Sequence, residues 1–180
     1  MKYVCLLRGV NVSGQRKVNM KVLCTELSDL GLTDVEYYLQ SGNLIVESEL
    51  SEANIEATIT GVLRDNYDYQ DVDLFLFDHA QLASIHQGML AFFSVQDNTK
   101  RHFTFLKNTP AEQIVSMMDE QEYAPDEYRI KDKMVYVYCP NGYGRTKIHN
   151  NYFERKLKVR ATTRNHKTVT TLLEKLTTTK

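Results

Sequence analysis

The sequence predicts an α+β fold, a tandem duplication of two ferredoxin-like (βαββαβ) subdomains that are each followed by an extra helix. Two observations lead to this prediction. Runs with strand-like and helix-like hydrophobic spacing alternate along the 180 residues, and their order is the same in both halves although the residue identities barely match. That order is the one of the split βαβ unit. We expect the subdomains at residues 1–95 and 96–180.

The first half reads as strand, helix, hairpin of two strands, helix, strand and final helix. The expected segments are 2–7, 20–30, 35–40, 43–47, 51–63, 72–77 and about 78–86. Gly31 ends the first helix, and Ser41-Gly42 has the composition of a two-residue hairpin turn. A mixed linker, residues 88–100, is expected to follow.

The second half repeats this order. The expected segments are 101–106, a helix opening at Pro110, 128–131, 134–139, 150–158, 159–162 and a terminal helix with apolar residues from 169 to 176. Aligning the halves shows one elaborated loop in each. Residues 8–17 contain about seven residues that the second half lacks, and residues 140–147 have no counterpart in the first half.

The loop at residues 8–17 is longer and more cationic than a strand-to-helix connection needs, which indicates a functional role. In a split βαβ unit this loop and the hairpin turn share one edge of the sheet. We therefore expect a pocket for an anionic or polar ligand there. Its candidate ligand-binding residues are Arg8, Gly9, Asn11, Ser13, Gly14, Lys17, Gln40, Ser41 and Asn43.

By the same rule, the loop at 140–147 is expected beside the exit of the last strand, where a helix start favours anions. The candidate ligand-binding residues of this second edge are Arg145, Lys147, Thr163, Arg164 and Asn165. Both sites have a structural alternative. Asn11, Ser13, Thr163 and Asn165 can cap turns or helices, and Ser41-Gly42 can simply close a hairpin.

Other chemistry finds little support in the sequence. The five histidines are scattered without metal-ligand spacing, so no metal site is expected. No dinucleotide or phosphate-loop motif occurs, no cofactor is expected, and Ser41 lacks the flanking pattern of a nucleophile elbow. Whether the chain is an enzyme stays open. The leading hypothesis is a binder of a phosphorylated or otherwise anionic small molecule.

Two alternatives come from composition. Residues 1–100 hold 7 Lys/Arg against 14 Asp/Glu, and residues 101–180 hold 15 against 9. The basic second half has alternate aromatic residues on two strands, which could stack bases in an RNA-binding module; they are Phe103, Phe105, Tyr136 and Tyr138. The opposite charges of the halves could instead serve a non-enzymatic protein-interaction module.

The sequence has no apolar run long enough to cross a membrane and no signal-peptide core, and it has three cysteines without paired spacing. We therefore expect a cytoplasmic protein without membrane contact and with reduced cysteines.

Three separated motifs carry a resemblance to a known family. They are the run from Arg8 to Gly14 followed by Lys17-Val18-Asn19-Met20, the run Tyr38-Leu39-Gln40-Ser41-Gly42-Asn43, and Thr162-Thr163-Arg164-Asn165 with Thr168-Val169. In these motifs the chain resembles the DUF1697 family of small bacterial proteins. The resemblance implies a cytosolic protein of two ferredoxin-like subdomains, and it implies no activity.

Overall fold

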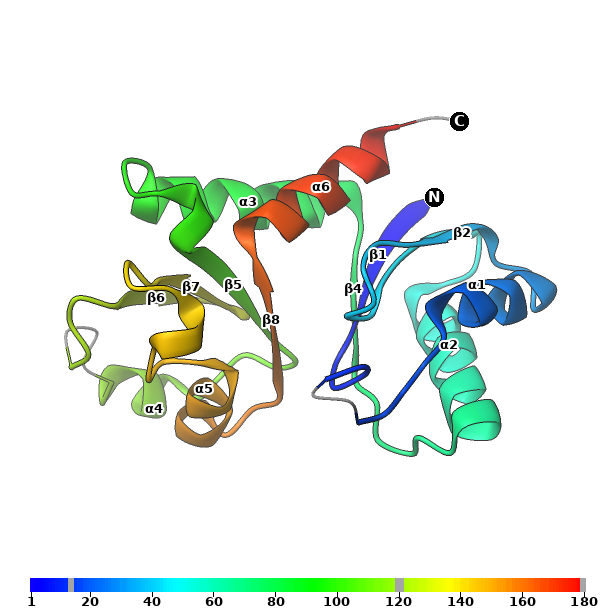
Figure 1. Ribbon diagram of the computed structural model, residues 1–180, viewed down its shortest axis with the longest axis horizontal. Coiled ribbons are helices and arrows are strands. Elements are labelled where there is room, and N and C mark those ends of the chain that lie inside the picture. Colours follow the sequence, from blue (N-terminus) through cyan, green and yellow to red (C-terminus); the bar gives the residue numbers. More distant parts are fainter. Residues whose placement is uncertain (13–14, 119–121, 179–180) are drawn as a thin grey trace. The chain divides into compact units, whose positions relative to one another are not determined.

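The computed structural model describes residues 1–12, 15–118 and 122–178. They form a mixed α+β fold with two four-stranded antiparallel sheets (Figure 1). The first half consists of β1 (Lys2–Leu7), α1 (Met20–Asp29), β2 (Thr33–Tyr37), β3 (Asn43–Glu47), α2 (Glu52–Tyr67), β4 (Leu74–Phe77) and α3 (His79–Phe93). The second consists of the short helix η1 (Asn98–Lys100), β5 (Arg101–Leu106), α4 (Glu112–Ser116), β6 (Glu127–Lys131), β7 (Met134–Tyr138), the short helix η2 (Tyr143–Arg145), α5 (Asn150–Leu157), β8 (Ala161–Asn165) and α6 (His166–Thr177).

The two sheets have equivalent strand orders, β2-β3-β1-β4 and β6-β7-β5-β8. In each sheet, the strand that comes first in the sequence lies between the third and fourth strands of the same half: β1 lies between β3 and β4, and β5 lies between β7 and β8. β1 pairs with β3 from Lys2 opposite Glu47 to Leu6 opposite Asn43, and β5 pairs with β7 from Arg101 opposite Tyr138 to Phe105 opposite Met134. The prediction of an α+β fold with two similar halves is confirmed.

In the first sheet, the core lies between the strands and the helices α1 and α2. Alternate side chains of β1 point to this face because strand side chains alternate between faces; Tyr3, Cys5 and Leu7 are all buried there. Leu23 of α1 and Ile59 of α2 meet them from their helices, each fully buried. Each such side chain stabilises the fold by roughly 1.5–3 kcal/mol.

In the second sheet, one face packs on α5. Val135 and Val137 of β7 are buried there with Tyr152 and Phe153. The opposite face carries Phe103, which is fully buried and lies 6.2 Å from the ring of His86 on α3. This sheet therefore has a helix on each face.

The helix α3 is longer than expected and includes residues placed in the linker. Gly88 was expected at the start of the linker, but it lies within α3. A Cβ atom at Gly88 would lie 2.3 Å from the Tyr136 hydroxyl. This glycine therefore allows α3 to approach the second sheet closely, and it does not end the helix.

Two further boundaries differ from the expectation. β2 ends at Tyr37 and a turn of residues 38–42 follows, so the prediction of a two-residue hairpin is wrong. The Asn43 side chain donates to the Tyr38 carbonyl across this turn at 2.8 Å, which stabilises the longer connection. β8 runs to Asn165 and not to residue 162, because residues 162–165 pair with β5.

By their internal contacts the residues divide into two units, Met1–Leu82 with Leu172–Lys180, and Ala83–Thr171. The end of α6 thus belongs to the first unit. There Lys175 lies 3.2 Å from Glu36, and Lys2 donates to the Thr178 carbonyl at 2.7 Å. Folding of 1–95 and 96–180 as separate subdomains stays a prediction. Within the described ranges, no helix is long and apolar enough to cross a membrane.

Candidate functional site

The loop after β1 lies against the hairpin turn, as the topology predicts. The Leu7 N–H donates to the Gly42 carbonyl at 2.7 Å. Asn11 completes the connection: its amide donates to the carbonyls of Val18 at 2.9 Å and Gln40 at 2.7 Å, and its oxygen accepts from the Val18 N–H at 2.8 Å. With φ of 54°, Asn11 adopts a backbone conformation that asparagine tolerates well. Asn11 is therefore a structural link between loop and turn.

Two of the three cations of this loop, Arg8 and Arg16, have carboxylates beside them. Arg8 lies 3.9 Å from Asp73, Arg16 forms an ion pair with Asp71, and the Arg16 guanidinium lies 5.8 Å from the centre of the Tyr69 ring. The aspartates offset the positive charge that the sequence places here. The first site is thus less attractive to an anion than the composition of its loop indicates.

The remaining residues of this edge have mixed environments. Asn43 is fully buried and donates to the Tyr38 carbonyl and the Ser41 hydroxyl. Gln40, Ser41 and Lys17 are exposed, and Gly9 is partly exposed with φ of 76°. Ser13 and Gly14 lie outside the described residues.

The second edge is arranged differently from the expectation. Thr163 lies within β8, and its hydroxyl contacts Thr104 at 2.8 Å and Asn150 at 3.1 Å. Asn165 accepts from the Thr168 N–H at 2.8 Å and so caps the start of α6, the structural alternative that the sequence left open.

Arg164 does not lie on a surface with Arg145 and Lys147. Its side chain is only 9% exposed and donates to the Thr162 hydroxyl at 2.7 Å and to the Thr163 carbonyl at 2.9 Å. Burial lowers the pKa of its guanidinium to about 10. Because strand residues alternate between faces, Thr163 and Arg164 point to opposite sides of the sheet. Burial argues against a surface that Arg164 shares with Arg145 and Lys147, and ligand binding by Arg164 stays a prediction.

Arg145 and Lys147 line a pocket of about 430 Å³ together with the segment 122–126. Asn141 supplies an amide and Tyr123 an aromatic ring to the same pocket. Both cations are exposed, and within residues 1–12, 15–118 and 122–178 neither has an ion-pair partner. This is the place where residues proposed from the sequence line a defined pocket.

Two carboxylates also line this pocket, and both already accept hydrogen bonds. Asp126 accepts from the Thr146 hydroxyl at 2.6 Å. Glu122 accepts from the Tyr123 hydroxyl and thereby raises the pKa of that tyrosine. The pocket thus carries two cations and two carboxylates, and its hydrogen-bond donors for a ligand are those of Arg145, Lys147 and Asn141.

Three of the four aromatic residues proposed to stack RNA bases are not accessible, and Tyr138 is half-buried. Phe103 and Phe105 are fully buried and Tyr136 is 3% exposed, because Phe92 and Phe93 of α3 pack on this face. Bases cannot stack on buried rings. The RNA-binding hypothesis thus loses the surface on which it was based.

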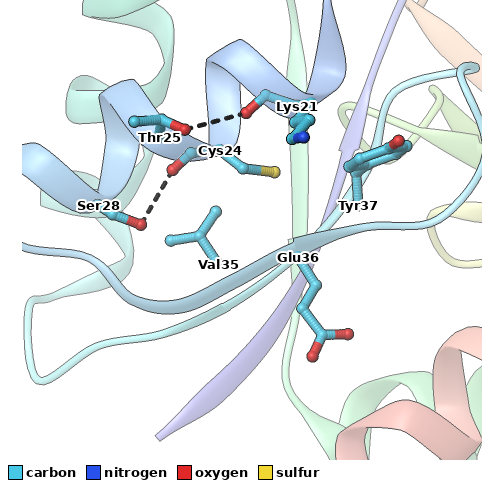
Figure 2. A pocket seen from close by; sticks show the side chains of 7 residues that line it. All are labelled: Lys21, Cys24, Thr25, Ser28, Val35, Glu36 and Tyr37. Atoms are coloured by element: carbon cyan, nitrogen blue, oxygen red, sulfur yellow. Dashed lines mark hydrogen bonds between the residues drawn. The ribbon is translucent and has the colours of Figure 1, made fainter.

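Two places were missed from the sequence. One is a cluster in the second unit, where His86 of α3 lies 5.1 Å from His166 of α6 by ring centres and both feel the charge of Arg101. The other is a pocket between α1 and β2 in the first unit (Figure 2). His86 and His166 are far apart in the sequence, so only the tertiary fold brings them together. The pocket depends on how α1 packs against β2, which periodicity alone does not show. No group of three or more metal-ligating side chains occurs in the part of the chain that the structure describes.

These features define a class of protein: a two-unit α+β protein with paired antiparallel sheets and a small polar pocket that offers hydrogen-bond donors. The chain belongs to the family described as "Protein of unknown function (DUF1697)", whose match covers residues 1–136. It is similar to a solved structure, that of the conserved bacterial protein SP0830 from Streptococcus pneumoniae, with 25% identity and a TM-score of 0.75 over 97% of this chain and 98% of that one. No curated protein matches the chain.

Proposed function

We propose that this protein binds a small phosphorylated or carboxylated molecule in the pocket lined by Asn141, Arg145 and Lys147. The observation that carries the proposal is the pair of cations without carboxylate partners among the described residues at a pocket of about 430 Å³. That volume suits a ligand of metabolite size. Arginine and lysine side chains form charge-assisted hydrogen bonds with phosphate and carboxylate oxygens.

Tyr123 adds an apolar surface next to these donors. Its ring packs edge-on against Tyr152 with centres 5.3 Å apart, which limits its movement. A ligand with a flat or apolar part beside its anionic group can therefore contact the pocket at both ends. We also infer that each half is a ferredoxin-like unit and that the two arose by duplication, which their common strand order supports.

Thermal unfolding of the intact chain tests the proposal, with orthophosphate, sugar phosphates, nucleotides and dicarboxylates as ligands at millimolar concentration. A ligand that binds only the folded state raises the melting temperature. We expect at least one ligand to do so, and we expect Arg145→Ala and Lys147→Ala to remove the shift.

Lys131→Ala is the matched control, because Lys131 is an exposed cation of the same unit outside the pocket and its loss should leave the shift unchanged. Arg8→Ala compares the two candidate sites. A panel without any shift, or a shift that survives the double variant at Arg145 and Lys147, contradicts the proposal. A shift that only Arg8→Ala removes would assign the ligand to the loop after β1.

A further inference from the structure

β2 is an edge strand of the first sheet and pairs only with β3. The Tyr38 N–H donates to the Asn43 carbonyl, and Glu36 lies opposite Ile45 two residues away. In an antiparallel ladder, residues that exchange hydrogen bonds alternate with residues whose backbone groups point away. The Val35 carbonyl and both backbone groups of Tyr37 therefore point out of the sheet, and Tyr37 is 37% exposed.

A groove runs beside this edge, between β2 and α1. It encloses about 480 Å³ and is lined by Lys21, Cys24, Thr25, Ser28, Val35, Glu36 and Tyr37. Figure 2 shows the Cys24 sulfur, the Val35 side chain and the Tyr37 ring facing the space between the two elements. These groups give the groove an apolar floor. Burial, with a further contribution from Glu36, raises the pKa of Cys24 to about 11, so its thiol serves here as an apolar group.

The charge available in the groove is positive. Lys21 stands at the α1 start of the groove near Tyr37, and across the described ranges its ammonium group has no ion-pair partner. Glu36 borders the groove, but its carboxylate points away from it (Figure 2) and lies 3.2 Å from Lys175. An occupant with a carboxylate at the Lys21 end therefore complements the groove.

We propose that the β2 edge and the α1–β2 groove bind an extended peptide segment that carries a small aliphatic residue and, two positions away on the same face, an acidic one. The peptide backbone pairs with the outward groups of Val35 and Tyr37, the aliphatic side chain enters the groove above Cys24, and the acidic side chain contacts Lys21. Addition of a strand to an open sheet edge, with an adjacent pocket for alternate side chains, is an established mode of peptide recognition. A small molecule would leave the edge hydrogen bonds unused.

The irregular pairing between Thr33 and Glu36 limits the length of the contact. The strand register shifts there, and Asp34 has φ of 46°, which bends the strand before Val35. Such bulges discourage long edge-to-edge pairing. The bound peptide is thus a short segment, and its complex with this protein is transient. This inference does not depend on the proposed function, because the groove and the Arg145 pocket lie in different units.

Selection of phage-displayed random short peptides on the intact chain tests the proposal. We expect the selected peptides to share an aliphatic residue two positions from Asp or Glu, and their synthetic forms to shift the amide resonances of Val35 and Tyr37. Lys21→Ala should weaken their binding about tenfold, the effect of one charge-assisted hydrogen bond. Lys17→Ala removes a neighbouring exposed cation outside the groove and should not change it.

Tyr37→Pro removes the N–H of residue 37, which points out of the sheet, and leaves the donors of the β2–β3 ladder in place. Edge strands accept proline at such outward-facing positions. We expect Tyr37→Pro to abolish binding, whereas Tyr37→Ala, which keeps the N–H and removes only the ring from the groove, should weaken binding less. Cys24→Phe fills the groove without altering β2 and should also abolish binding. This variant tests the proposal even if the proline variant does not fold. Failure to select any peptide, or selected peptides that bind the Cys24→Phe variant with unchanged Kd, would overturn the proposal.

Discussion

His166 has a buried imidazole nitrogen, Nε2, that has no hydrogen-bond partner among the residues that the structure describes. Burial first, and then the nearby His86 and Arg101, lower the pKa of His166 to about 4. Burial and Arg101 also lower the pKa of His86, whose Nε2 lies 3.1 Å from the Thr170 hydroxyl. Both rings are therefore neutral in the folded protein at pH 7. Protonation of either one places a charge beside Arg101.

The pH dependence of stability follows from these pKa values. In the unfolded chain a histidine takes up its proton near pH 6.5, whereas the folded protein holds His166 neutral down to about pH 4. Between these values the unfolded state binds more protons, so stability falls as the pH falls. We expect the free energy of unfolding, measured by urea denaturation, to decrease from pH 7 to pH 4.5. This decrease should be less steep for His166→Gln than for the unchanged protein. Equal slopes for both proteins would contradict this.

Arg164 and Asn165 illustrate what single residues reveal before a structure is known. The capping role of Asn165 could be predicted, because a cap depends on neighbouring residues only. The burial of Arg164 could not, because it depends on where β8 ends. Three more residues of strand pairing place Arg164 on a covered face of the sheet, and periodicity alone does not locate such a boundary.

At the scale of an element, the hairpin turn before β3 requires glycine at residue 42. Gly42 has φ of 77°, and a Cβ atom there would lie 2.5 Å from Val10 Cγ2 and 2.9 Å from Leu7 Cβ. Gly42→Ala should therefore cost roughly 2–4 kcal/mol, from backbone strain and from overlap with the loop after β1. Urea unfolding measures this loss.

Gly142→Ala separates the two causes. Gly142 has φ of 92°, but a Cβ atom added there would have nothing within 4 Å. Only the backbone strain remains, which costs roughly 1–2 kcal/mol. If both variants lose equal stability, the turn before β3 is not packed against Val10.

The same turn marks a limit of reading elements from sequence. The topology correctly predicted that the loop after β1 meets residues 40–43, because strand direction fixes which ends share an edge. The predicted length of the turn was wrong, because the observed turn is held by two contacts that periodicity does not show. Asn43 donates to the Tyr38 carbonyl, and the Leu7 N–H donates to the Gly42 carbonyl. The pairing of Arg8 and Arg16 with Asp73 and Asp71 was also missed, since those aspartates lie on the approach to β4, more than fifty residues away.

At the scale of the whole molecule, the order of elements could be predicted because helical and strand periods are local properties. The membership of Leu172–Lys180 in the first unit could not, because it depends on contacts such as that between Lys175 and Glu36. The peptide groove and the histidine cluster were missed for the same reason. The cluster combines residues of α3 and α6, and the groove depends on how α1 packs beside the edge of β2.

This membership predicts the result of a truncation. A chain that ends at Thr171 lacks Leu172 and Leu176, which are 0% and 8% exposed, and the ion pair of Lys175. Loss of two buried leucines removes roughly 3–6 kcal/mol, which corresponds to a decrease of about 10 °C in melting temperature for a chain of this size. The ion pair contributes less than about 1 kcal/mol, because such partly exposed pairs are weak, so Lys175→Ala is the control with a small effect.

Hydrogen exchange of the truncated chain shows which unit the segment stabilises. Because Lys2 of β1 and Glu36 of β2 contact it, the amides of β1 and β2 should exchange faster, while those of β5 and β7 should keep more of their protection. Faster exchange in β5 alone would assign the end of α6 to the second unit. An unchanged melting temperature would show that the buried leucines make no net contribution to stability.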